Sequence, residues 1–199
     1  IFGSYNIFNA AAALSVALAL DVPADAAAEA LAGVKTLAGK MEKIDGGQNF
    51  QVLVDYAFEP KALESLYQNI DLIPYRRLIH VLGSAGGGRD RSRRPILGNM
   101  AGKKADIVIV TDEDPYDEDP REIIDQVAAG AIESGKEEGK NLYKINDRRS
   151  AFRLAFNLAS EGDLVLITGK GAEQYICGPK ESKIPWDDRL AAREELEKI

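Results

Sequence analysis

Short apolar runs that alternate with amphipathic segments dominate the sequence from residue 39 onward. Leu78–Leu82, Leu164–Thr168 and residues 105–110 are apolar nearly throughout, and Leu142–Ile145 is a weaker run of the same kind. Strands that are apolar on both faces are typical of a parallel sheet covered by helices on each side. The pattern therefore predicts an α/β fold with a doubly wound, mostly parallel sheet.

Helix and turn signals separate these predicted strands. Pro60, Pro95 and Pro120 each suit the first turn of a helix, where the missing N–H costs no hydrogen bond. We expect helices over residues 60–69, 95–103, 148–159 and 188–198, and another that begins at Pro120. Two further strands, residues 41–45 and 50–55, flank a Gly-Gly pair that favours a hairpin turn.

The first 38 residues have a different character. Residues 4–20 are rich in alanine and other helix formers, with Ser4 placed as an N-cap, and residues 24–34 form a second predicted helix. Two short helices cannot make a domain of their own. We therefore place a domain boundary near residues 37–40, with residues 1–38 as the helical end of another domain that packs on the sheet. The chain opens at Ile1 without an initiator methionine, which indicates a fragment or a processed product.

Composition excludes several classes of partner. The chain has 199 residues, is 45% hydrophobic and carries a formal net charge of −7, so a nucleic-acid partner is not expected. The single cysteine suits a reducing cytoplasm, and with one histidine the chain offers no zinc constellation and no predicted metal site. No apolar run approaches the roughly 20 residues that span a bilayer. We expect a cytoplasmic protein without a membrane partner.

Candidate chemistry concentrates where the predicted strands end. Residues 83–95 read GSAGGGRDRSRRP and follow the strand at Leu78–Leu82. Backbone N–H groups at such a turn can hold an anion, and arginine forks suit carboxylate or phosphate, although a solvated basic turn fits the spacing equally well. Polar segments also follow residues 55, 110 and 168. Because ligands bind at the carboxyl ends of parallel strands, we expect the four segments to share one edge and one site.

Other polar residues have plainer interpretations. His80 lies between apolar neighbours and is expected in the core, Cys177 is expected to pack, and Trp186 is expected to anchor the last helix. The six carboxylates of residues 112–119 invite a divalent-ion site. Two prolines and the lack of an EF-hand pattern favour an ordinary acidic turn instead.

The polar segments match, in order, the motifs of one enzyme family. They are NIFN at residues 6–9, GKME at 39–42, DYAFEP at 55–60, the glycine–arginine loop, DP and EDP within 114–120, GKGAE at 169–173 and DDR at 187–189. The chain resembles the C-terminal part of a Mur ligase, of the group that adds the third residue to UDP-N-acetylmuramoyl-dipeptide in peptidoglycan synthesis.

This resemblance implies a Rossmann-like C-terminal domain over residues 39–199, preceded by helices left over from a central ATPase domain. It implies a ligase that uses ATP to turn a carboxylate into an acyl phosphate, which the amine of a free amino acid then displaces. The implied cofactors are ATP and Mg²⁺, with the main Mg²⁺ ligands in an upstream domain. No catalytic residue is assigned to this chain, and without a Gly-x-x-x-x-Gly-Lys-Ser/Thr sequence the isolated chain is expected to be inactive.

The resemblance also assigns binding residues. For ATP it implies Asn6, Asn9, Lys40, Asp55 and Arg91, with Asp55 accepting a hydrogen bond from the ribose. For the amino acid it implies Arg89, Glu113, Asp114, Tyr116, Gly169 and Glu173. Arg89 would hold a carboxylate and Glu173 would pair with an ammonium group, whereas Arg91 and Arg93 would face phosphate or solvent.

The chain departs from the family pattern at several positions. Lys40 replaces an arginine, and Phe58 and Ala172 replace histidines. Tyr116 stands where enzymes that use meso-diaminopimelate carry an arginine, and two acidic residues precede it, so we expect lysine as the added amino acid. Two alternatives remain: another ligase of the superfamily, such as folylpolyglutamate synthase, and a nucleotide-binding module without ligase chemistry, which would favour a Gly-x-Gly-x-x-Gly turn after its first strand.

Overall fold

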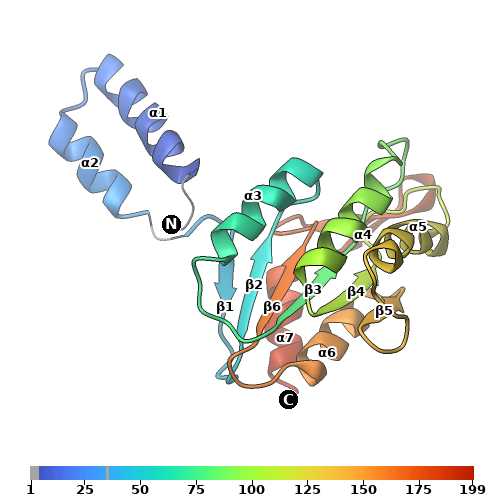
Figure 1. The fold of residues 1–199 in the computed structure, drawn as a ribbon. Coiled ribbons are helices and arrows are strands. Elements are labelled where there is room, and N and C mark those ends of the chain that lie inside the picture. The colour runs from blue at the N-terminus through green and yellow to red at the C-terminus, as the bar shows by residue number, and fades with distance from the viewer. Residues whose placement is uncertain (1–4, 35) are drawn as a thin grey trace.

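Six strands form one sheet within residues 5–34 and 36–199, which the computed structural model describes (Figure 1). The order across the sheet is β1-β2-β6-β3-β4-β5. Only β1 runs antiparallel to its neighbour; the other adjacent pairs are parallel. The strands are β1 (Glu42–Ile44), β2 (Gln51–Asp55), β3 (Leu78–Leu82), β4 (Ile107–Thr111), β5 (Leu142–Ile145) and β6 (Leu164–Thr168). The predicted doubly wound, mostly parallel α/β sheet is confirmed.

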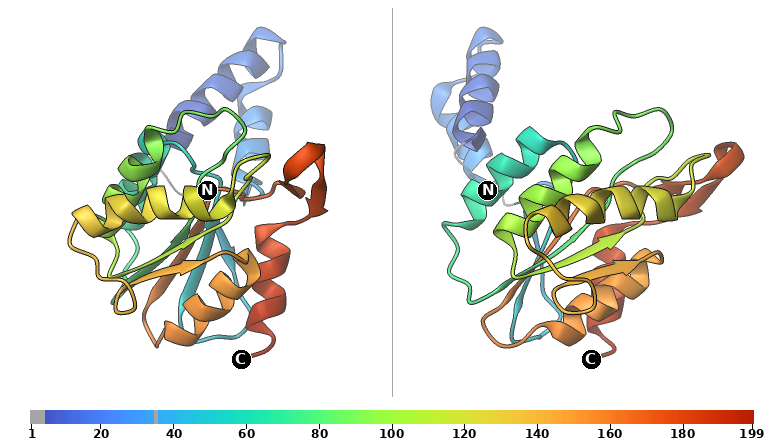
Figure 2. Two further views of the ribbon diagram at one scale, coloured as in Figure 1. Left: turned by 90° about the vertical axis from the view of Figure 1, so that its right-hand side faces the viewer. Right: turned by 45° about the vertical axis from the view of Figure 1, so that its right-hand side comes forward.

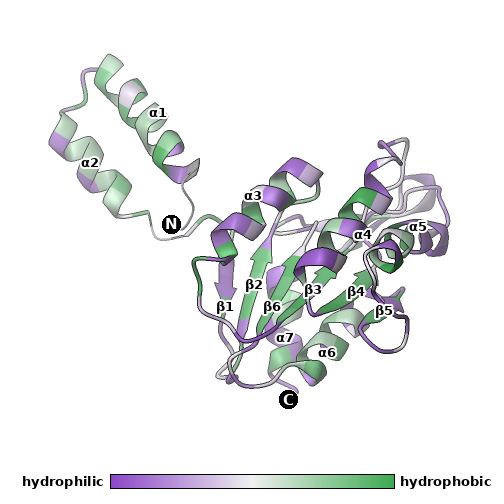
Figure 3. Ribbon diagram, in the orientation of Figure 1, coloured by the Kyte–Doolittle hydropathy of each residue, from purple (hydrophilic) through white to green (hydrophobic). Residues whose placement is uncertain are grey.

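Helices cover both faces of the sheet (Figure 2). One face carries α3 (Pro60–Ile70), α4 (Arg93–Lys104) and α5 (Pro120–Glu133), and the other carries α6 (Arg148–Leu158) and α7 (Asp188–Leu196). Successive strand residues enter different cores: Leu166 packs with the first set of helices, and Val165 and Ile167 pack with the second. Both side-chain faces of a central strand are therefore buried, which explains the uninterrupted apolar runs (Figure 3).

The predicted interpretations of His80 and Trp186 are confirmed. His80 is fully buried, with its ring nitrogens 2.9 Å from the Tyr67 hydroxyl and 3.0 Å from the Thr168 hydroxyl. Burial lowers the pKa of His80 to about 3, so the ring is neutral. Trp186 donates from its indole N–H to Asp188 in the first turn of α7 and packs edge-on against Phe152 of α6.

The parallel pairing places the carboxyl ends of four strands at one edge of the sheet. β2 and β3 both pair with β6, and β3 pairs with β4, all in the same direction. The segments that follow Asp55, Leu82, Thr111 and Thr168 therefore leave from the same edge, as expected. β4 continues one residue beyond the predicted end at residue 110.

Helices α4 and α5 cross with their backbones in contact. A Cβ atom added to Gly98 would lie 1.8 Å from the carbonyl oxygen of Val127, and one added to Gly130 would lie 1.9 Å from that of Pro95. Neither position accepts a side chain while the helices keep this spacing. The contact fixes the N-terminal end of α4, and with it the glycine–arginine loop that leads into α4.

Several bounds differ from prediction by one or more residues, and one pair of strands was not predicted. Helix α4 begins at Arg93 rather than at Pro95, with Arg93 and Arg94 both buried in its first turn and paired with Glu59 and Glu118. A hairpin of β7 (Tyr175–Cys177) and β8 (Lys183–Pro185) was not predicted, since each strand has only three residues and no apolar run. Helix α7 ends at Leu196, before the predicted residue 198.

The N-terminal helices do not pack on the sheet, so that expectation was wrong. Helices α1 (Tyr5–Ala19) and α2 (Ala24–Ala32) lie against each other and extend away from it (Figure 1). Ile7 and Phe8 of α1 are 71% and 76% exposed, which shows that apolar composition alone did not direct this helix onto the core. Ser4 lies outside the described residues. No helix of the described residues combines the length and the apolarity needed to cross a membrane.

Replacing Gly98 by alanine is expected to lower the free energy of unfolding of the purified chain by about 3 kcal/mol, because the helices must separate to admit the methyl group. Urea denaturation followed by circular dichroism measures this change. Gly33→Ala, at an exposed residue with negative φ after α2, is the matched control and should change stability little. Equal stability of the Gly98→Ala variant and the wild type would contradict the close crossing.

Candidate functional site

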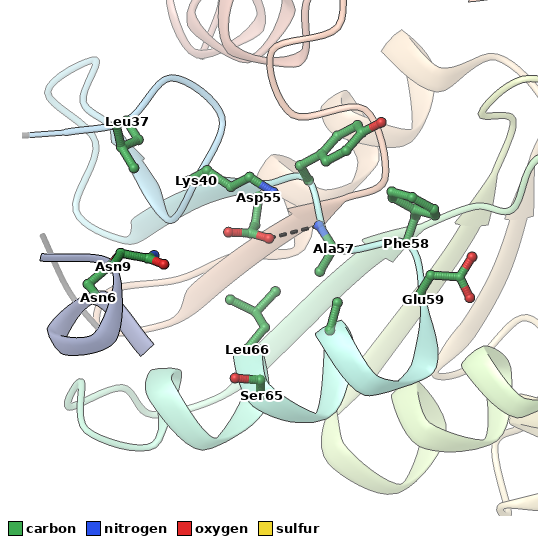
Figure 4. A pocket seen from close by; sticks show the side chains of 12 residues that line it. Asn6, Asn9, Leu37, Lys40, Asp55, Ala57, Phe58, Glu59, Ser65 and Leu66 are labelled. Carbon is green, nitrogen blue, oxygen red and sulfur yellow. Dashed lines mark hydrogen bonds between the residues drawn. The ribbon is translucent and has the colours of Figure 1, made fainter. Parts of the chain in front are cut away.

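A pocket of about 520 Å³ opens beside the carboxyl end of β2 (Figure 4). The start of α1 forms one wall, the first turns of α3 form another, and the segments around Lys40 and Asp55 complete it. The lining residues are Asn6, Asn9, Leu37, Lys40, Asp55, Tyr56, Ala57, Phe58, Glu59, Ala62, Ser65 and Leu66. Four of the five residues predicted to bind ATP therefore face one cavity.

The Asp55 carboxylate is held by backbone N–H groups. Its two oxygens accept hydrogen bonds from Met41 at 2.7 Å and from Ala57 at 2.8 Å. Burial raises the pKa of Asp55, and the hydrogen bonds from Met41 and Ala57 oppose that rise. The carboxylate thus ties the turn before β1 to the segment after β2 and keeps a fixed orientation at the pocket.

Tyr56 occupies the border between this pocket and the loop after β6. Its ring lies 4.6 Å from the Lys40 ammonium, and its hydroxyl donates to Glu173 at 2.9 Å. Burial and the Glu173 carboxylate raise the pKa of Tyr56 to about 12, so the hydroxyl remains a donor at neutral pH. In the sequence, Tyr56 is part of the DYAFEP motif, and nothing in that motif indicates its contact with Glu173.

A second group of predicted residues lies around residues 111–120. We call these residues the acceptor segment, because the resemblance implies that they lie next to the incoming amino acid. The ammonium of Lys170 is buried and contacts Asp114 and Glu173, each at 2.7 Å. The other oxygen of Asp114 accepts the N–H of Cys177 at 2.7 Å. One ammonium is therefore shared by two carboxylates, of which Asp114 is buried and the side chain of Glu173 stays 40% exposed.

Glu113 is enclosed between two strand ends. Its side chain fills the space where Gly83 and Gly169 lack a Cβ atom, and a Cβ at Gly169 would lie 2.3 Å from its Oε2. That oxygen has no hydrogen-bond partner among the described residues. Burial raises the pKa of Glu113 to about 7, and nearby Arg148 opposes the rise. Gly169 thus makes room for Glu113, a role the sequence did not reveal.

Tyr116 and Arg89 lie face to face across the site. Tyr116 has a left-handed backbone with φ of 53°, and its N–H donates to Cys177 at 3.0 Å. The Arg89 guanidinium carbon lies 5.7 Å from the centre of the Tyr116 ring, within range of a cation–π contact. Arg89 is exposed and has no carboxylate partner within the described part of the chain. Its guanidinium is free to meet an anion.

The other arginines of the loop differ from one another. Arg91 is 65% exposed and pairs with Glu118 at 3.0 Å, so it lies with the acceptor segment and does not line the pocket. Arg93 is buried, pairs with Glu59 and stacks near Phe58, so the expectation that it faces phosphate or solvent was wrong. Arg94 is fully buried and donates to Glu118, Gln126 and the carbonyl of Ala85.

Arg148 organises the site without having been predicted. Its fully buried guanidinium forms two hydrogen bonds with Asp188, at 2.8 and 2.7 Å. It also donates to the carbonyls of Asp112 at 3.0 Å and Thr168 at 2.8 Å, where two of the site loops begin. No spacing in the sequence links Arg148 to these partners; Asp188 within the DDR segment was the only signal.

Metal ligands do not gather in this region. Residues 5–34 and 36–199 contain no group of three or more His, Cys, Asp or Glu side chains arranged to hold a metal ion. Within residues 112–119, Asp114 is bound by Lys170, Glu118 by Arg91 and Arg94, and Asp117 by the backbone N–H of Lys180, whereas Glu113 is enclosed without such a partner for its Oε2 in the part of the chain that the structure describes. These residues do not fit a Mg²⁺ site of their own.

Comparison with known proteins gives consistent matches. The family model described as "Mur ligase, glutamate ligase domain" matches residues 39–171. A UDP-N-acetylmuramyl-tripeptide synthetase of Roseiflexus sp. is 45% identical over 99% of the chain, and a UDP-N-acetylmuramoyl-L-alanyl-D-glutamate–2,6-diaminopimelate ligase of Syntrophomonas wolfei is 42% identical over 98%. A solved structure of a ligase with the latter name covers the whole chain with 29% identity and a TM-score of 0.71.

The match covers only part of these proteins. The chain spans 38% and 39% of the lengths of the two relatives and 39% of the solved chain.

Glu113→Gln is expected to stabilise the chain in a pH-dependent way. The pKa of Glu113 in the folded state, about 7, lies above its ordinary value of 4.5. Ionisation therefore costs the folded state increasing free energy between these two pH values and a constant amount above them. The free energy of unfolding of the variant, minus that of the wild type, should rise by roughly 3 kcal/mol from pH 4.5 to 7 and then level off.

Urea titrations at several pH values measure that difference. Glu161→Gln, at an exposed loop position, is the control and should give a flat difference. A flat profile for Glu113→Gln as well would contradict the enclosed, unpaired carboxyl group.

Proposed function

Because the chain belongs to the Mur ligase family, we propose that it is the part of an ATP-dependent peptide ligase that binds the incoming amino acid and closes over the nucleotide. The observation that carries this proposal is the arrangement of two binding regions along one edge of the sheet. One is the pocket at Asp55, and the other is the acceptor segment with Arg89. The UDP-N-acetylmuramoyl-dipeptide is the proposed carboxylate substrate.

We assign the pocket at Asp55 to the nucleotide. Its volume of about 520 Å³ lies within the range of small-molecule sites, and its wall combines apolar groups such as Leu66 with a few polar ones. Asp55 offers a fixed carboxylate to a ribose hydroxyl, and Lys40 offers a positive charge to phosphate. Asn6 and Asn9 add amide groups from α1, joined by a 3.1 Å hydrogen bond.

We assign the acceptor segment to the amino acid. Arg89 presents an exposed guanidinium, which binds a carboxylate in a two-point geometry. Glu173 presents the partly exposed carboxylate that pairs with an ammonium group. Tyr116 contacts the Arg89 guanidinium, and Gly169, in the same loop as Glu173, leaves room for Glu113.

The chemistry proposed for the intact ligase depends on how the protein positions the substrates, and it needs no covalent bond between a substrate and the protein. ATP transfers its γ-phosphoryl group to the dipeptide carboxylate, and the amine of the amino acid attacks the resulting acyl phosphate and releases phosphate. Charge on the phosphoryl group must be neutralised during both steps. The Mg²⁺ ligands and the residues that grip the triphosphate are proposed to lie outside this chain, so the isolated chain should form no amide bond.

We further propose that the intact ligase adds a basic amino acid, lysine first, in preference to meso-diaminopimelate. Tyr116 donates at most one neutral hydrogen bond where the second carboxylate of meso-diaminopimelate would need a cation. Asp114 and Glu173 share one ammonium, that of Lys170, so a net negative charge remains there and would repel that group. Lys170 pairs with both Asp114 and Glu173, but Asp114 is buried and also accepts the N–H of Cys177, whereas the side chain of Glu173 is 40% exposed, so we assign the side-chain ammonium to Glu173.

Assaying the intact ligase with lysine, ornithine and meso-diaminopimelate in parallel is the test of this function. We expect ATP-dependent ligation of a basic amino acid to UDP-N-acetylmuramoyl-dipeptide, with kcat/KM for meso-diaminopimelate lower by at least about 100-fold, since its charge would be left unpaired. The 199-residue chain alone should show no ATP turnover. A preference for meso-diaminopimelate would refute the argument from Tyr116, and failure with all three would refute the ligase.

Arg89→Ala in the intact ligase is expected to raise KM for the amino acid by about tenfold or more, because a charge-assisted pair is lost. Arg94→Ala is expected to act on stability instead, lowering the free energy of unfolding by roughly 3 kcal/mol, because Glu118 loses a buried partner. Steady-state kinetics and thermal denaturation separate the two effects. Arg121→Ala, exposed on α5, is the control. An equal rise of KM in both loop variants at unchanged stability would mean that the arginines act only as a diffuse positive field.

A further inference from the structure

Tyr56 belongs to both binding regions. Its ring lines the pocket assigned to the nucleotide and lies over Lys40, at 4.6 Å from the ammonium. Its hydroxyl leaves the pocket and donates to Glu173 at 2.9 Å, in the region assigned to the amino acid. One side chain thus contacts groups that would meet two different substrates.

A continuous series of polar contacts runs on from that hydroxyl. Glu173 pairs with Lys170 at 2.7 Å, and the same ammonium pairs with Asp114 at 2.7 Å. Lys170 is only 1% exposed and Asp114 is buried, so these two charges interact with little screening by water, whereas the side chain of Glu173 is 40% exposed. The series reaches from the wall of the pocket to the acceptor segment without a gap filled by solvent.

Asp114 connects the series by hydrogen bonds to the two segments that lie near Tyr116. Its carboxylate accepts the N–H of Cys177, and its carbonyl accepts the N–H of Gly86 at 2.7 Å. The glycine–arginine loop and the β7–β8 hairpin are therefore both attached to the residue where the series ends. A change in the position of Asp114 would move the groups that surround the amino acid.

The exposed ends of the series are the parts that ligands would order. Lys40 is exposed, Tyr56 is half-buried, and the side chain of Glu173 is 40% exposed. A ligand that immobilises one of these side chains bears part of the entropic cost of ordering the others, so the second ligand binds more tightly.

We propose that Tyr56 is a positioning residue that couples nucleotide binding to amino-acid binding through Glu173, Lys170 and Asp114. The proposal rests on the functions assigned above to the two regions. Its direction is positive: bound nucleotide holds Lys40 and the Tyr56 ring, the hydroxyl then holds Glu173, and Glu173 meets the amino acid already oriented. By thermodynamic linkage, the amino acid must strengthen nucleotide binding by the same factor.

Isothermal titration calorimetry on the intact ligase tests this coupling. The dissociation constant of a non-hydrolysable ATP analogue is measured without and with saturating L-lysine, which meso-diaminopimelate replaces if the parallel assay selects it. We expect the dissociation constant without the amino acid to be about tenfold larger than the one with it in the wild type, and this ratio lies within the usual range of coupling between sites. The reciprocal titration, amino acid without and with the analogue, must give the same ratio.

The informative variant is Tyr56→Phe, which keeps the ring in the pocket and removes only the hydroxyl. We expect its ratio to fall below about twofold, because a single hydrogen bond to a charged acceptor carries the connection. Glu173→Gln should retain the acceptor for Tyr56 but weaken the pair with Lys170, giving an intermediate ratio. Tyr143→Phe is the matched control: its hydroxyl donates to the Lys140 carbonyl on the surface, and its ratio should equal that of the wild type.

A merely structural role for the hydroxyl gives a different result. Loosening of the pocket would weaken binding of the analogue equally with and without amino acid, leaving the ratio at its wild-type value, and that outcome would overturn the proposal. A wild-type ratio near one, with both ligands bound, would also overturn it while leaving the proposed function intact. Failure of the wild type to bind the analogue or either amino acid would refute the assigned functions and the coupling together.

Discussion

The buried guanidinium of Arg148 is the interaction on which the rest of the site depends. It binds Asp188 with two hydrogen bonds and also holds the carbonyls of Asp112 and Thr168. These carbonyls mark the points where the acceptor segment and the loop after β6 leave the sheet. A charge buried so fully is tolerated only with all its donors satisfied, and those donors here fix two loops and helix α7 at once.

Much of the fold was predictable because its signals are local. Apolar runs, prolines at helix starts and a glycine pair at the hairpin defined the strands and helices of the main domain. The shared edge followed from parallel pairing, so the gathering of Asp55, Arg89, Asp114 and Glu173 was also within reach of the sequence. In each case the physical cause acts over a few residues or follows from one rule of topology.

What the sequence did not reveal depends on contacts between distant residues. Arg94 looks like its neighbour Arg91, and both pair with Glu118, yet only Arg94 is fully buried, because Gln126 and the carbonyl of Ala85 approach it in the folded chain. Lys170 likewise reads as part of a glycine loop, although its two carboxylate partners bury it. The expected packing of α1 on the sheet was also wrong. Its apolar side chains are exposed, because local helix signals do not determine where a helix packs.

We propose that nucleotide and amino acid bind side by side at the carboxyl edge of this sheet. Two-dimensional ¹H–¹⁵N spectra of the 199-residue chain, recorded as ADP is added, test the nucleotide half of that claim most directly. We expect shifts of backbone amides to concentrate at the residues lining the pocket, including Lys40, Tyr56 and Ser65. Shifts concentrated instead at the smaller cleft between α5 and β5, around Arg121 and Lys144, would contradict it.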